Sequence, residues 1–272
     1  MSSLLLAGLF AGLVAIAVTV AIERFGGRVG GLLGTLPTTI VPASLGIRAE
    51  ATTDEALAAA MYVVPAGMLL NALFLWLWRA VPGRLPASTL GVRLALMTAI
   101  SLAAWLGAAI SFVITMQRLD DLATTRLVGL LTTAGIVVVG VLACLRAPPT
   151  PKGVNHVSPG TLLGRGLLAG LAVGGAVWLT NVGGPLAAGV ATVFPAIFLT
   201  TMVSLWLAQG EAVPAGAVGP MMLGSAAVAS YALIAAWSLP ALGPWLGTPV
   251  AWIGAVLTTT VPANEWLRRR AG

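Results

Sequence analysis

The stretch ERFGGRVGGLLGTLPTTIVP, residues 23–42, decides how the rest of the chain is interpreted. It is apolar enough for a lipid bilayer, yet it holds five glycines, two prolines and three threonines. Glycine loosens a helix, and proline removes one of its backbone donors. Inside a membrane, broken backbone survives only where it lines a cavity or is covered by protein. The stretch therefore predicts an interrupted membrane helix.

The composition of the whole chain indicates an integral membrane protein. The 272 residues are 58% hydrophobic and only 8% charged, whereas a soluble domain carries about 25% charged residues. Too few charges are present to cover the surface of a soluble fold. We therefore expect an all-α polytopic protein in the plasma (inner) membrane. The net charge of +6 is spread over the ends of apolar segments, which argues against a nucleic-acid partner.

The apolar segments predict about nine membrane-spanning helices, because one span needs roughly 20 apolar residues. We expect them at about residues 3–22, 29–47, 57–79, 89–116, 126–146, 161–180, 186–208, 214–237 and 247–266.

The distribution of basic residues supports that count. Nine spans place 11 of the 14 lysines and arginines on one side of the membrane and 3 on the other. Cytoplasmic loops carry the excess of basic residues, so the N-terminus is expected outside and the C-terminus in the cytoplasm. The smaller group contains Arg48, Arg118 and Arg126.

The chain also resembles itself when shifted by 158 positions. GLFAGL at 8–13 then meets GLLAGL at 166–171, and Gly26, Gly31 and Pro37 meet Gly184, Gly189 and Pro195. An odd number of spans between the two copies inverts the second one. We therefore predict two inverted four-helix repeats, residues 1–117 and 161–272, joined by a linking helix and loop at 118–160. Inverted repeats are common in secondary transporters, whose sites lie near the midplane.

The two interrupted helices carry most of the predicted substrate-binding residues. Prolines free a carbonyl on the preceding turn, and threonine hydroxyls bond either that carbonyl or a ligand. An amide and a tyrosine deep in other spans complete the set; their alternative role is to hold helices together. The candidates are Pro37, Thr38, Thr39, Asn71, Pro195, Thr200, Thr201 and Tyr231.

Three further positions are candidates for coupling or gating. Glu23 closes an apolar run beside Arg28, and its copy in the second repeat is Asn181. An ionisable residue within a membrane span suggests a functional role by default. The alternative is that Glu23 lies at the interface, where neighbouring arginines neutralise it.

The sequence favours a secondary-active transporter for a small polar solute or cation, with alternating access about the helices at 29–47 and 186–208. A channel, a lipid-translocating protein or a non-catalytic membrane subunit remains the alternative. We expect no enzyme activity, no metal site and no cofactor, with coupling to protons or sodium left open. Lipid and a small solute or ion are the expected partners, and a homodimer is left open. The plan resembles that of the drug/metabolite transporters, but no residue role is carried over.

Overall fold

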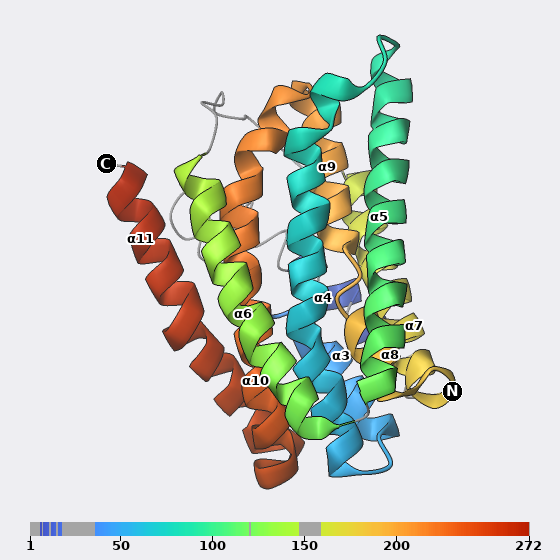
Figure 1. Ribbon diagram of the computed structural model, residues 1–272, viewed down its shortest axis with the longest axis vertical. Coiled ribbons are helices and arrows are strands. Elements are labelled where there is room, and N and C mark those ends of the chain that lie inside the picture. Colours follow the sequence, from blue (N-terminus) through green and yellow to red (C-terminus); the bar gives the residue numbers. More distant parts are fainter. Residues whose placement is uncertain are drawn as a thin grey trace.

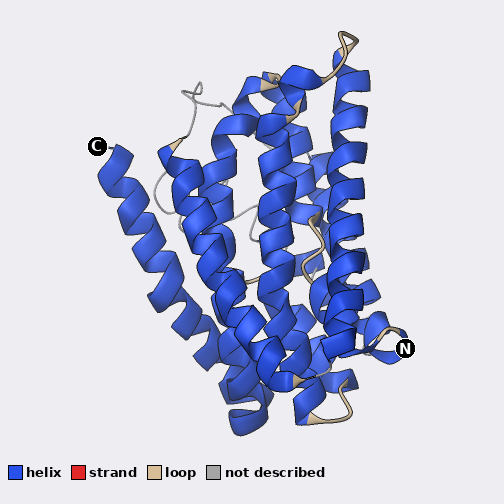
Figure 2. Cartoon of the chain, viewed as in Figure 1, coloured by secondary structure: helices blue, strands red, loops and turns tan. Residues whose placement is uncertain are grey.

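The computed structural model describes residue 6 and residues 8–10, 12–14, 16–17, 36–119, 121–146 and 159–271. This part of the chain is almost entirely helical and contains no strand (Figure 2). The predicted all-α class is confirmed for it. Five of its helices are long and apolar enough to cross a membrane, so an integral membrane location is also supported. Five helices do not establish the predicted count of nine.

The bounds of the described helices are as follows. They are α3 (Ile40–Glu50), α4 (Asp54–Ala80), the 3₁₀ turn η1 (Pro82–Arg84), α5 (Leu90–Leu119), α6 (Leu122–Leu145), α7 (Pro159–Val182), α8 (Gly184–Ala191), α9 (Ala196–Gln209), α10 (Ala212–Ala255), the π-helical turn η2 (Val256–Thr260) and α11 (Val261–Ala271). The ends of α4 to α7 lie within four residues of those predicted.

The centre of the molecule is formed by α4, α6 and α10, which pack against one another (Figure 1). The short helices α8 and α9 also contact α4, and α5 packs against α4 as well. Much of the apolar surface of α5 and α6 is exposed, including Leu106 and Leu131. Soluble monomers rarely expose so much contiguous apolar surface, whereas lipid-facing helices must.

One of the five long helices is a hairpin. The apolar helical stretch Ala215–Arg270 has 56 residues, which would extend about 84 Å as one straight helix. Gly243 bends it with φ 70° and ψ 173°. Beyond the bend the chain returns along itself: Ser238 donates to the Gly247 carbonyl at 2.9 Å, and Ser230 lies 2.6 Å from the Thr259 hydroxyl. This stretch therefore supplies two antiparallel arms.

One predicted helix is interrupted, and another is described only over its second part. The helix expected at 29–47 is described only from residue 36, where residues 36–39 are not helical and α3 begins at Ile40. The helix expected at 186–208 is divided into α8 and α9 by residues 192–195. The division of the second segment agrees with the broken helix predicted there. In the first segment, the residues before 36 lie outside the described part of the chain, and the start of α3 falls within two positions of the start of α9 in the 158-residue register.

The described part of the N-terminal segment is helical and crosses α7 through glycines. A Cβ added at Gly8 would lie 2.9 Å from the Gly170 carbonyl oxygen, and one added at Gly12 would lie 2.9 Å from that of Gly166. The partner number falls as the residue number rises, so the two helices are antiparallel. Their backbones approach closely at these glycines, and the Ile16 side chain lies against Gly166.

One end of the bundle holds most of the described arginines, and we call it the basic end (Figure 1). Here α4, α6 and α9 end while α5 and α10 begin. Arg79 joins three of these helices, because its Nε donates to the Ala215 carbonyl at 3.1 Å and its Nη1 to the Ala143 carbonyl at 3.0 Å. The arginines of this end are Arg79, Arg84, Arg93, Arg146, Arg268, Arg269 and Arg270.

Candidate functional site

The break between α8 and α9 is the candidate site. Pro195 has no N–H to continue a helix, and it is buried. The Ala196 N–H, which would reach back to residue 192 in a continuous helix, donates instead to the Phe194 carbonyl at 2.7 Å. The Thr192 hydroxyl donates to the Gly189 carbonyl at 2.6 Å. Backbone carbonyls are therefore released from the helical ladder in the middle of an apolar segment.

Asn71 of α4 supplies a donor to this break. Its side chain is only 2% exposed, and its Nδ2 donates to the Val193 carbonyl at 2.8 Å and to the Met68 sulfur at 3.5 Å. Its Oδ1 is also buried and accepts no hydrogen bond from the described residues. A buried polar atom without a partner is costly in an apolar environment. Asn71 thus both holds the break and presents a free acceptor beside it.

Two glycines let α4 and the broken helix approach each other. A Cβ at Gly67, one turn before Asn71, would lie 2.4 Å from the Val193 Cγ2. A Cβ at Gly189 in α8 would lie 2.1 Å from the Ala60 carbonyl oxygen. Side chains essentially never come this close, so both contacts require glycine. The amide of Asn71 reaches Val193 because of this approach.

The start of α3, beside Pro37, is held differently. Pro37 is buried, and the Thr38 Oγ1 is buried with no partner among the described residues. One turn into α3, Ser44 donates its hydroxyl hydrogen to the Val41 carbonyl at 2.9 Å. The Ser44 Oγ also lies 2.8 Å from the Tyr231 hydroxyl of α10, and the two hydroxyls share a hydrogen bond. Tyr231 ties α3 to the long hairpin.

The predicted substrate-binding residues do not gather at one place through direct bonds. Asn71 meets the break beside Pro195, whereas Tyr231 bonds to α3. Thr200 donates to the Ala196 and Ile197 carbonyls of its own helix at 2.9 and 3.1 Å, as the kinked-helix alternative expects. Thr201 and Thr39 are half-buried, the latter just before α3.

The side chains of the three coupling candidates lie outside the described part of the structure. Glu23 and Arg28 lie outside the described residues, and Asn181 lies on α7 with an undescribed side chain. Among the residues that are described, no three histidine, cysteine, aspartate or glutamate side chains are placed to hold a metal ion. The groups offered by the described part of the site are therefore carbonyls, hydroxyls and one amide.

The sequence did not identify the partners that complete the site. Val193 is an ordinary apolar residue whose carbonyl matters only because the helix breaks there. Gly67 could have been noticed, because a glycine four residues before a buried amide lies on the same helix face. Ser44 gave no comparable signal.

Fold and site together define an all-helical membrane protein with a polar break inside an apolar bundle. No known protein family, curated protein or solved structure matches the chain. Its function has to be inferred from its own residues.

Proposed function

We propose that this chain is a secondary-active membrane transporter for a small polar solute or cation, with alternating access about the two helix breaks. The observation that carries the proposal is that a helix begins shortly after Pro37 and another shortly after Pro195, at Ile40 and at Ala196, which differ by two positions in the 158-residue register. Transporters built from inverted repeats place discontinuous helices at the midplane, where released backbone groups bind the substrate.

The glycine crossing supports an inverted repeat. In the register, Gly8 corresponds to Gly166 and Gly12 to Gly170. Gly8 contacts Gly170, and Gly12 contacts Gly166. Such a reciprocal pattern, in which residue a touches b′ and residue b touches a′, is the one expected for two segments related by a local two-fold axis. The antiparallel arrangement of the two segments agrees with this relation.

The chemistry of the described site favours a neutral polar solute or a cation. At the break, the Val193 carbonyl oxygen and the Asn71 Oδ1 are hydrogen-bond acceptors, and the buried Thr38 Oγ1 before α3 is another. Hard cations and hydrogen-bond donors bind such oxygens. The excess of arginines at the basic end favours placing that end in the cytoplasm, with the N-terminus outside. Coupling through Glu23, Arg28 and Asn181 stays a prediction.

The test is a flux measurement on purified protein in liposomes with an imposed proton or sodium gradient. A transporter gives saturable, gradient-dependent movement of a tested ion or solute. Asn71→Ala should reduce the rate at least about tenfold, because it removes both the donor to Val193 and the free acceptor. Ser101→Ala is the matched control, since Ser101 is equally buried but bonds to the Thr98 carbonyl of its own helix.

Other outcomes count against the proposal. Conductance that does not saturate with ion concentration would identify a channel. Movement of a fluorescent lipid between leaflets, without solute flux, would identify a lipid-translocating protein. If flux in Asn71→Ala equals that in Ser101→Ala, the break is not part of the pathway.

A further inference from the structure

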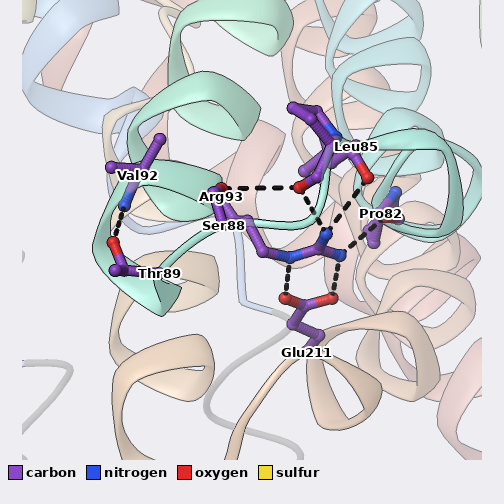
Figure 3. Close-up of polar contacts among 8 residues, drawn as sticks. Pro82, Leu85, Ser88, Thr89, Val92, Arg93 and Glu211 are labelled. Carbon is purple, nitrogen blue, oxygen red and sulfur yellow. Dashed lines mark hydrogen bonds and ion pairs between the residues drawn. The ribbon is translucent and has the colours of Figure 1, made fainter.

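At the basic end, one guanidinium group joins two of the connections between helices. Arg93 at the start of α5 forms a two-pronged ion pair with Glu211, which immediately precedes α10; Nε lies 2.5 Å from Oε1, and Nη2 lies 2.7 Å from Oε2 (Figure 3). The same guanidinium donates to the carbonyls of Pro82, Leu85 and Pro86 at 2.9 to 3.1 Å. All five N–H groups of arginine are thus used.

This ion pair joins the two halves of the chain. Arg93 and the three carbonyls belong to the connection between α4 and α5, whereas Glu211 belongs to the connection between α9 and α10. The side chains of Arg93 and Glu211 are only 17% and 29% exposed. The Arg93 guanidinium lowers the pKa of Glu211 from its usual value, so the carboxylate stays charged. We call this pair and its three carbonyls the latch.

An aromatic cluster lies in the helices just beneath the latch. Trp78 of α4 and Trp206 of α9 are fully buried and pack edge to face, with ring centroids 5.7 Å apart. Trp105 of α5 packs in the same way on Phe194, inside the break, at 5.4 Å. These residues share one buried cluster with Met202. The route from the break to the basic end is therefore filled by aromatic rings.

Several buried polar atoms in and near this aromatic cluster lack a hydrogen-bond partner among the described residues. The Nε1 atoms of Trp78, Trp105 and Trp206 are buried and have no acceptor within the described part of the chain, and the Nη2 of Arg79 shares this condition. Each unbonded donor costs free energy while it is buried and recovers it when water enters. The packing thus contains groups that favour opening, and the latch opposes them.

The opposite end has no comparable closure in the described residues. Its ion pair, between Arg48 and Asp54, is 3.3 Å long, joins two neighbouring helices of the same half and has side chains 33% and 59% exposed. An open recess of about 390 Å³ also lies there, lined by acidic, aromatic and apolar side chains of α4, α6 and α10. The lining includes Glu55, Tyr62 and Trp237.

We infer that the structure is the state closed at the basic end, and that the Arg93–Glu211 latch is the gate whose opening admits water past Trp78 and Trp206. This inference rests on the proposed transport function, in which each end of the site opens in turn. Opening requires the loop before α5 and the loop before α10 to separate. Loss of either partner of the ion pair shifts the population toward the open state.

The test is the reaction of a cysteine placed beneath the latch. Met202→Cys reports from the aromatic cluster in a Cys144→Ala background, in which the chain has no other cysteine. The protein is held in lipid nanodiscs and treated with a membrane-impermeant maleimide. Glu211→Gln should raise the labelling rate at least about tenfold, because a bidentate charge-assisted pair is among the stronger hydrogen-bonded contacts. Arg93→Lys, which keeps the charge but loses the planar fork, should raise it as well.

Arg48→Ala is the matched control, because it removes the ion pair of the opposite end and should leave Met202→Cys labelling unchanged. Equal labelling in Glu211→Gln, Arg93→Lys and the parent protein overturns the inference, and so does an equal increase in Arg48→Ala. Gel filtration and circular dichroism establish that each variant is folded; if Glu211→Gln is not, Arg93→Lys decides alone. Labelling needs no substrate, so a working latch in a protein without solute flux refutes the transport function and leaves the gate.

Discussion

Gly189→Ala tests the packing that positions the break. The added Cβ would lie 2.1 Å from the Ala60 carbonyl oxygen and 2.4 Å from the Val63 Cγ2. Non-bonded heavy atoms are comfortable at about 3.5–4.0 Å, so α8 has to move away from α4 by roughly 1 Å or more. The carbonyl is main chain and cannot rotate aside as a side chain would. The contact between Asn71 and the break should loosen as a result.

Two terms of opposite sign set the magnitude. Replacing a helical glycine by alanine stabilises a protein by about 0.4–1 kcal/mol where the new methyl group fits. Overpacking of a close contact costs about 1–3 kcal/mol, and occasionally more. Overpacking dominates at Gly189, whereas only the first term applies at Gly107 in α5, where an added Cβ meets nothing within 4 Å. The two variants should therefore shift stability in opposite directions.

The measurement is thermal unfolding of both variants in the same detergent. The midpoint of Gly189→Ala should lie roughly 3–10 °C below that of Gly107→Ala, and its solute flux should fall. If the two midpoints coincide, α8 does not pack on α4 through its backbone. The close packing of α8 on α4 then does not position Asn71 against the break.

Two further substitutions test other contacts. Tyr231→Phe removes the hydroxyl that is hydrogen-bonded to Ser44, so the midpoint should fall by the equivalent of about 0.5–1.5 kcal/mol, while Tyr62→Phe should change it little; equal shifts would contradict a stabilising role for this bond. The side-chain and backbone donors of the first turn of α6 lower the pKa of Asp121. A depressed pKa stabilises the fold above the ordinary value near 4 and is lost as the pH falls through the folded value. Asp121→Asn should therefore weaken the loss of stability at acidic pH, which circular dichroism from pH 6 to pH 2 would detect; an unchanged profile would refute this role.

Much of the fold could be predicted because its determinants are local. Long apolar runs fix α4 to α7, since a membrane helix needs about 20 such residues. The break at Pro195 was also expected, because proline lacks a donor wherever it lies. Glu265 and Arg269 form an ion pair at 2.9 Å, which their spacing alone makes foreseeable, since residues four apart on a helix are neighbours.

The rest depends on contacts between distant residues. Arg93 and Glu211 are 118 positions apart, and each alone looks like an ordinary charge at the end of an apolar segment. Asn71 and Val193 are 122 apart, and one partner is a main-chain atom that has no signature in the sequence. A single sequence records which groups are polar, but not which of them face each other after folding.

The glycine crossing of the N-terminal segment and α7 has a mechanical consequence. Interlocked side chains resist sliding, because each must change rotamer before its neighbour can pass. Gly8 and Gly12 meet Gly170 and Gly166 through backbone atoms, and Ile16 adds one side chain, which lies against Gly166, so few side chains interlock at this contact. The N-terminal segment and α7 can therefore tilt against each other more easily than helices whose side chains interlock. Larger side chains at these four glycines would hinder that motion.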